Sequence, residues 1–449
     1  MRFNQRFYLF TSGTQRTLRS ARRGVTARLA LQLACLSLLA AIVCNEATAE
    51  KPDDICAIAQ SAISEASEIR GLALKKPVPC EAHTKEQVKK YLLDTIETQI
   101  PPEKLLNEER VYKLLGLIPE EYAYKEGLVQ LYVGQIGGYY DPQKDYFVMA
   151  SWMPAVLQTT IAVHELTHAL QDQHFDLETF LDHDLDNTDL LLARSALTEG
   201  DASLVMTDYT RRLFGQPTLQ EETGVESLML QNVIGASFMT ALGTVPESLQ
   251  LMLIFPYTSG LRFGHYLLKQ DGYRALDRAF QTPPRTTEEI LHPEKYPAII
   301  GKEYSVVTLS DIPAYDQAQW EVAYRDTMGE FGISLFAAAL KLEKQVSAQT
   351  AAGWGGDLLT LSLSRKNNCD AERLDWVTRW DSTKDAEEFF TGVRTGLKTR
   401  FGIDPATFES SPAHIVGKTW RLHVTQEKSR KEVLLTMKTV NDCVKEDKQ

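Results

Sequence analysis

His164, Glu165 and His168 are the residues of this 449-residue chain whose types and spacing point most directly to chemistry. They form the pattern His-Glu-x-x-His. On a helix, residues four apart lie on one face and about 6 Å apart along the axis, so the two imidazoles can bind one metal ion. Glu165 directly follows the first His, so its carboxylate can reach a metal-bound water as a general base. The pattern therefore predicts a catalytic Zn²⁺ site.

The residues around this pattern favour the helix that the site requires. The stretch 161–172 contains no Gly or Pro, and its other residues are mostly apolar or good helix formers. The alternative is an ordinary helix that carries two polar His residues. Unliganded imidazoles would be costly to bury in such an apolar helix, which favours the metal site.

A catalytic zinc needs a third protein ligand, and two residues compete for that position. His174 lies six residues after His168, as in the metzincin pattern His-x-x-Gly-x-x-His. In that pattern a Gly turns the chain back towards the metal, but here the position holds Gln171. On a continuing helix, His174 would lie about 9 Å further along the axis. His174 is therefore the weaker candidate.

Glu199 is the better candidate for the third ligand. It lies 31 residues after His168 on a predicted second helix, Leu190–Thr210, and the intervening chain is long enough for the two helices to pack antiparallel. Gly200 is unfavourable in the middle of a helix, so its presence suggests that another backbone packs closely there. The alternative is that Glu199 is an exposed helix residue.

The motif and the downstream Glu-Gly pair resemble the gluzincin branch of the zincin metallopeptidases, over roughly residues 125–270. Beyond these motifs, the chain is similar to uncharacterised exported bacterial proteins. The resemblance implies that His164, His168 and Glu199 bind Zn²⁺ and that Glu165 is the general base. It also implies an exported zinc-dependent metallopeptidase that hydrolyses peptide bonds in a peptide or protein substrate.

One position departs from the gluzincin pattern. Gluzincins of the thermolysin type have an Asp four residues after the ligand Glu, whereas this chain has Ser203. Asp201 or Asp172 could orient a ligand His instead, so the residues behind the ligands are left open.

Peptide hydrolysis also needs a donor that stabilises the developing oxyanion. The segment 255–265 offers Tyr257, Arg262 and His265. We name Tyr257 and His265 as catalytic candidates, although each of the three also has a plausible structural role.

Two other functions are compatible with the same residues. The chain could be a non-catalytic zinc-binding module for interaction or maturation in the periplasm. It could also be a metal-free scaffold whose C-terminal part binds a partner. The sequence does not define the substrate, because specificity depends on the shape of the pocket.

Residues 1–49 have the features of a signal peptide. Seven Arg residues precede the apolar stretch Leu29–Val43, and Ala47-Thr48-Ala49 has the small-x-small form of a cleavage site. The apolar stretch of about 15 residues is short for a membrane span, although an uncleaved anchor is the alternative. We expect a periplasmic or secreted protein without stable membrane insertion after cleavage.

The charge of the chain argues against a nucleic-acid partner. The whole chain has 48 basic and 60 acidic residues; without residues 1–49 it has 41 and 59, a net charge of −18. No basic stripe occurs outside the N-terminus. Such a charge favours solubility after export over adhesion to anionic lipid.

Four cysteines remain after the leader: Cys56, Cys80, Cys369 and Cys443. An even number in an exported chain suggests disulfides. Proximity in sequence favours Cys56–Cys80 and Cys369–Cys443, but three connectivities are possible.

The remaining pattern predicts an α+β fold with three parts after the signal peptide. Residues 50–125 form a helical segment, residues 126–300 a mainly helical zincin-like catalytic domain, and residues 301–449 a C-terminal α+β domain. In the catalytic domain, Leu128–Val133 and Asp145–Met149 are the predicted strands of a hairpin with an Asp-Pro turn. This hairpin either binds an extended substrate through its edge or is only structural.

The C-terminal domain is predicted to alternate strands and helices. The order is strand, helix, two strands, helix and two strands, at residues 304–309, 320–347, 358–364, 374–380, 384–399, 413–425 and 431–439.

Overall fold

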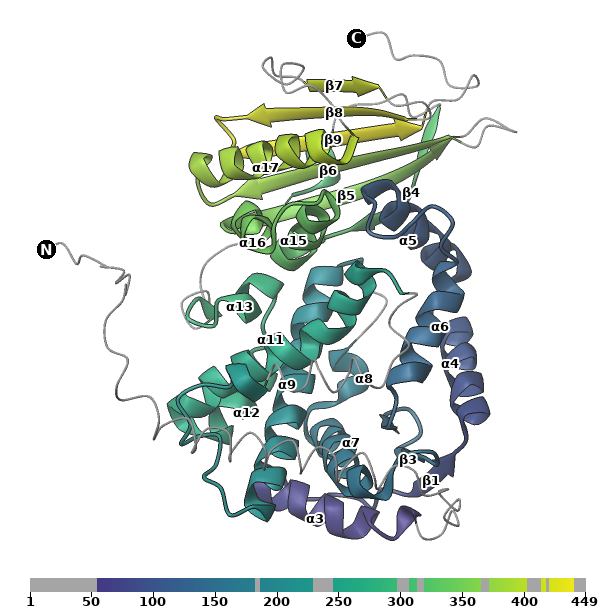
Figure 1. Ribbon diagram of the computed structural model, residues 1–449, viewed down its shortest axis with the longest axis vertical. Helices are drawn as coiled ribbons and strands as arrows, with labels where there is room; N and C mark the ends of the chain where they lie inside the picture. Colours follow the sequence, from purple (N-terminus) through teal and green to yellow (C-terminus); the bar gives the residue numbers. More distant parts are fainter. Residues whose placement is uncertain are drawn as a thin grey trace, which may run out of the picture. The chain divides into compact units, whose positions relative to one another are not determined.

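The computed structural model describes residues 55–181, 186–228, 245–296, 307–312, 319–364, 371–401, 413–416 and 420–439. Lys51–Gln449 forms one compact unit of helices and two sheets, so the predicted α+β class is confirmed (Figure 1). The predicted signal peptide, the Cys369–Cys443 pairing and the boundary between residues 300 and 301 lie outside the described residues.

The N-terminal part begins with α3 (Ala59–Arg70), β1 (Cys80–His83), α4 (Lys85–Gln99) and α5 (Pro102–Leu115). A capping box between Thr84 and Gln87 starts α4. A disulfide joins Cys56 to Cys80, which confirms this pairing. It ties the start of the α3 region to β1.

A three-stranded sheet lies next to the helices that carry the motif. Its order is β1-β3-β2, with β2 (Gly138–Asp141) antiparallel and β1 parallel to β3 (Tyr146–Ala150). The hairpin turn is where the sequence predicts it, but the predicted strand Leu128–Val133 is wrong. This stretch belongs to helix α6 (Tyr124–Gln135), which buries Tyr124 and Leu131 and partly buries Leu128. Their spacing of three or four residues is helical.

Long helices form the centre of the helical region that contains the motif. They are α7 (Ala155–Phe175), α9 (Thr188–Leu213) and α11 (Glu247–Asp271), with the shorter α8 (Leu177–Phe180), α12 (Tyr273–Gln281) and α13 (Thr287–Leu291). The Asn187 side chain accepts a hydrogen bond from the Leu190 N–H and caps α9. Helix α11 contains Pro256 and continues through it.

The C-terminal part is a six-stranded antiparallel sheet of order β4-β5-β6-β9-β8-β7. Helices α15 (Gly329–Ala339), α16 (Lys344–Ala351) and α17 (Thr383–Phe401) lie on one face of it (Figure 1). The strands are β4 (Trp320–Asp326), β5 (Trp354–Ser364), β6 (Glu372–Trp380), β7 (Ala413–Val416), β8 (Trp420–Glu427) and β9 (Glu432–Thr439).

Two predictions for this part are wrong. The predicted helix 320–347 is strand β4 followed by α15 and the start of α16, because β4 pairs with β5 and Gly329 adopts a left-handed φ of 69° where α15 begins. The predicted strand 413–425 is divided into β7 and β8.

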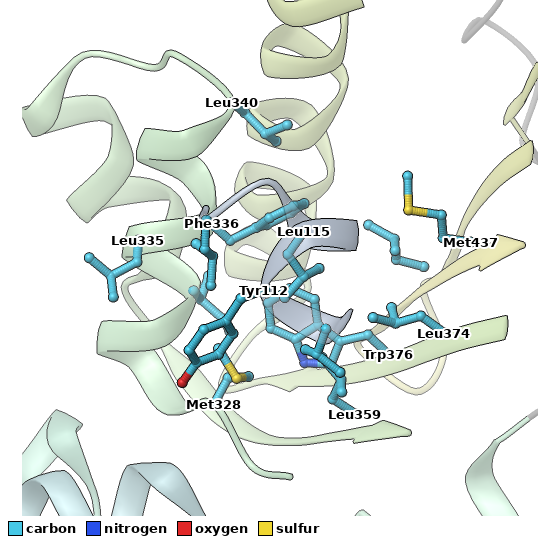
Figure 2. Close-up of a cluster of buried hydrophobic side chains, with 14 of the residues drawn as sticks. Tyr112, Leu115, Met328, Leu335, Phe336, Leu340, Leu359, Leu374, Trp376 and Met437 are labelled. Carbon is cyan, nitrogen blue, oxygen red and sulfur yellow. The ribbon is translucent and has the colours of Figure 1, made fainter. Parts of the chain in front are cut away.

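The core of the C-terminal sheet includes residues from the N-terminal helices. Figure 2 shows Tyr112 and Leu115 of α5 beside Phe336, Leu340 and Trp376. Asn107 also donates a hydrogen bond to the carbonyl of Ala323. Helix α5 therefore completes a core that lies more than 200 residues away in the sequence.

Candidate metal centre

Helices α7 and α9 carry the three motif residues and the predicted third ligand. Helix α7 is continuous and places His164 and His168 one turn apart, with Glu165 next to His164, while Glu199 lies on α9. Glu199 meets both imidazoles, and the predicted set of ligands is therefore brought together in space.

Close packing between α9 and α11 fixes the position of Glu199. A Cβ at Gly200 would lie 2.2 Å from the carbonyl oxygen of Gly260, and a Cβ at Gly260 would lie 2.1 Å from that of Ala196. Only glycine allows such an approach. The close backbone packing suggested by Gly200 is confirmed, and it brings Tyr257, one turn before Gly260, next to Glu199.

The distances between the three ligand atoms suit a tetrahedral zinc ion. His164 Nε2 lies 3.1 Å from Glu199 Oε2 and 3.2 Å from His168 Nε2, and His168 Nε2 lies 3.5 Å from Glu199 Oε2. Zinc bonds of about 2.0–2.1 Å at tetrahedral angles separate two ligand atoms by about 3.3 Å. The three residues thus fit three vertices of a zinc tetrahedron and leave the fourth for water.

The orientation of the His168 ring is fixed by Gln171. Gln171 Nε2 donates to the carbonyl of Thr198, so Oε1 of the same amide is the acceptor that lies 2.8 Å from His168 Nδ1. His168 Nδ1 therefore carries the proton, and in the neutral ring Nε2 presents its lone pair to the other ligands. His164 differs, because its buried Nδ1 has no hydrogen-bond partner among the described residues.

The charges at the centre favour a cation between the ligands. Burial works against the ionised form of Glu199, yet the imidazoles of His168 and His164 hold its pKa well below the usual range. Burial likewise works against protonation of His168, but the Glu199 carboxylate raises the pKa of this imidazole to about 9. The arrangement therefore attracts positive charge, and a divalent cation would compete with protons for the same atoms.

Glu165 lies beside the ligands and under the open edge of the small sheet. Burial raises the pKa of Glu165, while the nearby His164 and His168 oppose this increase. Its carboxylate also accepts a hydrogen bond from the backbone N–H of Tyr140 on β2.

Among the described residues, strand β2 pairs only with β3, so its other edge is open. The Ala150 N–H bonds to the Gly137 carbonyl, and antiparallel pairs alternate between bonded and non-bonded. The backbone N–H and C=O groups of Gly138 and Tyr140 therefore point away from β3. For Tyr140, this is the side of Glu165.

Tyr257 is the predicted oxyanion candidate that lies at the centre. Its ring stacks at 6.2 Å from the His164 ring, and its hydroxyl hydrogen-bonds to Glu199. The Glu199 carboxylate, together with burial and Glu165, raises the pKa of Tyr257 well above its usual value, so the hydroxyl stays protonated. The residue is 37% exposed and can be reached from solvent.

The structure places the other candidates elsewhere. The buried His265 ring bonds to the carbonyl of Leu219 at 2.9 Å, and Arg262 donates to the carbonyl of Leu291. His174 bonds to the carbonyl of Ala73 at 2.8 Å and does not belong to the ligand group. Asp172 accepts the Tyr140 hydroxyl at 2.8 Å, so it binds the hairpin and not a ligand His.

Two features of the centre were not predicted from the sequence. The sequence marks Gln171 only as a departure from the metzincin pattern. It also predicts Leu128–Val133 as the first hairpin strand, whereas the strand with the open edge is β2. The signal for Gln171 was its place one helical turn after His168, where its side chain can reach the ring.

Among the described residues, only His164, His168 and Glu199 form a group of side chains that could hold a metal ion. Among these residues, none of the helices has both the length and the apolar character needed to cross a membrane.

Residues 319–440, from just before β4 to just after β9, match a family model described as a domain of unknown function (DUF8575). No curated protein and no solved structure matches this chain.

Proposed function

We propose that this protein is a zinc-dependent metallopeptidase that uses Glu165 as its general base. The observation that carries the proposal is the convergence of three ligand atoms at separations of 3.1, 3.2 and 3.5 Å, with a second carboxylate, that of Glu165, beside them. A purely structural ion pair would not need two imidazoles and two carboxylates at one point.

The residues of the chain have distinct parts in this reaction. Zinc, when bound, would acidify a water molecule to a pKa of about 7 and polarise the peptide carbonyl. Glu165 removes the proton from the attacking water and returns it to the leaving amine. The Tyr257 hydroxyl, protonated and next to Glu199, donates a hydrogen bond to the developing oxyanion.

The open edge of β2 supports a peptide as the substrate. The backbone N–H and C=O of Gly138 and the C=O of Tyr140 on that edge pair with no other described strand, and an extended chain would bind there as an added strand. Because Glu165 lies next to Tyr140, a peptide bound in this way would pass close to the base.

The oxidised Cys56–Cys80 pair is compatible with export, since disulfides persist mainly outside the cytosol. Together with the signal-peptide features of residues 1–49, it supports a periplasmic or secreted location.

The Glu165→Gln variant tests the proposal. We expect it to retain about one zinc per chain by elemental analysis, because Glu165 is not a ligand. Cleavage of a peptide library should fall about 10³-fold, since the proton acceptor is lost. Glu178→Gln, an exposed substitution on α8, is the matched control and should cleave like the wild type.

Other outcomes would identify the alternatives. A wild-type protein that binds zinc but cleaves no peptide would indicate a zinc-binding interaction or maturation module. A protein purified with zinc present that holds none would indicate a metal-free scaffold. Unchanged cleavage by Glu165→Gln would contradict the role of Glu165.

A further inference from the structure

A line of buried polar residues leads from His168 to the N-terminal helix α3. Gln171 Nε2 donates to Asp201 Oδ2 at 2.9 Å and to the Thr198 carbonyl at 3.0 Å. Asp201 in turn pairs with Arg70 at 2.7 Å, and both of these side chains are fully buried. Arg70 is the last residue of α3.

The side-chain amide of Gln171 has two possible orientations, with either Oε1 or Nε2 towards His168. The contact with Asp201 selects one of them. An amide has a donor end and an acceptor end of nearly the same shape. Because the donor end faces two acceptors, Asp201 and the Thr198 carbonyl, only Oε1 is left for His168. The ring must then donate from Nδ1, which leaves Nε2 free to bind a metal.

A buried ion pair is costly unless its geometry is good, so its partners should have a further use or a strong structural one. Arg70 holds the Asp201 carboxylate in place and also pairs with Asp277 at 2.8 Å. Helix α3 is in turn tied to β1 through the Cys56–Cys80 disulfide. The N-terminal segment is thus connected with the ligand helix through Arg70 and with the small sheet through the disulfide.

We infer that Gln171 is a positioning residue for His168 and that the Arg70–Asp201 pair holds its amide in the required orientation. Helix α3 is then a structural part of the metal centre. This inference rests on the proposed binding of zinc by His164, His168 and Glu199.

The central test compares Gln171→Met with Gln158→Met. Both residues are buried amides on α7, but Gln158 donates to the carbonyl of Met153 and is not near a ligand in the sequence. Zinc affinity is measured by competition with a chromophoric chelator on the full chain. We expect a loss of about 10- to 100-fold for Gln171→Met, the usual effect of removing a residue that orients a ligand. Gln158→Met should stay near the wild-type affinity.

A spectroscopic measurement separates positioning from a general loss of stability. In zinc-loaded protein labelled with ¹⁵N-histidine, the His168 Nδ1–H proton should be protected from exchange in the wild type and in Gln158→Met. It should lose this protection in Gln171→Met. Equal affinities and unchanged protection in Gln171→Met would overturn the inference, as would equal losses of affinity in both variants.

The contribution of α3 is tested by Arg70→Lys, which keeps the charge but not the planar donor group. We expect weaker zinc binding than in the wild type but stronger binding than in Gln171→Met, in a variant whose circular dichroism shows that it is folded. If Arg70→Lys binds zinc with wild-type affinity, α3 does not contribute to the metal centre. If the wild type binds zinc without cleaving peptides, the proposed catalysis fails, and these affinities still decide the positioning role.

Discussion

Two carboxylates, Asp357 in the C-terminal sheet and Glu199 in the helical region, are surrounded in opposite ways. Asp357 on β5 accepts four N–H groups at 2.8–3.0 Å, from the backbone of Met328 and Gly329 and the indoles of Trp354 and Trp376. The chain itself thus supplies donors for both carboxylate oxygens. Such a group stabilises the fold and has no capacity left for a ligand.

Glu199 instead faces two imidazoles whose ring nitrogens can themselves bind a metal ion. His164 Nε2 lies 3.1 Å and His168 Nε2 lies 3.5 Å from Glu199 Oε2. Such a set is unfavourable unless a proton or a metal ion lies between its members. The difference between the two carboxylates therefore separates a structural acid from one that is placed to bind a cation.

Removing Asp357 should have the largest effect on stability. In Asp357→Ala, four buried N–H groups lose their acceptor, and each such loss costs roughly 1–3 kcal/mol. We expect the free energy of unfolding to fall by about 5 kcal/mol, with or without zinc, as measured by urea denaturation. Glu387→Ala, an exposed change on α17, should change it by less than about 0.5 kcal/mol. A small effect of Asp357→Ala would show that Asp357 is not a structural carboxylate and does not differ from Glu199 in this way.

The sequence predicts those parts of the centre that depend on neighbouring residues better than those that depend on tertiary contacts. The His164–His168 pair follows from helix periodicity alone, so its geometry could be predicted. Glu199 required a tertiary contact, and Gly200 gave a hint of it. His265 could not join Tyr257, because eight residues along the continuous helix α11 correspond to about 12 Å.

The fold was harder to predict where distant contacts decide the local structure. Trp320–Asp326 is a strand because it pairs with β5, a contact that lies outside any local window. Helix α5 joins the core of the C-terminal sheet for the same reason, although nothing in its sequence names that partner. The hairpin turn, in contrast, follows from local Asp-Pro chemistry.

The second test asks whether Glu199 depends on a cation as the comparison implies. Zinc at 1,000 times its dissociation constant should stabilise the wild type by about 4.1 kcal/mol. We expect Glu199→Gln to lose most of this gain at the same zinc concentration, because one of the three proposed ligands is removed. The measurement is thermal unfolding with and without zinc.

The Glu178→Gln protein should keep the zinc-dependent gain and serves as the control. A full zinc-dependent gain in Glu199→Gln would show that Glu199 is not a ligand. The carboxylate would then be closer to Asp357 in character than its surroundings suggest.

The smallest of the three effects concerns the Tyr257 hydroxyl, which donates its one proton to Glu199. Tyr257 is 37% exposed, so a bound substrate oxyanion can replace Glu199 as the acceptor of this hydrogen bond. We expect Tyr257→Phe to lower kcat about 100-fold, equivalent to about 2.7 kcal/mol, with little change in KM and a full complement of zinc. Steady-state cleavage of a peptide identified from the library provides the measurement.

Tyr132→Phe is the matched control for this prediction. Tyr132 lies on α6, is 41% exposed and interacts electrostatically with Tyr257, but no ligand contacts it among the described residues. It should therefore retain nearly all activity. If Tyr257→Phe instead raises KM and leaves kcat unchanged, the hydroxyl binds substrate in the ground state and does not stabilise the transition state. If both values stay unchanged, the Tyr257 hydroxyl serves the Glu199 contact alone.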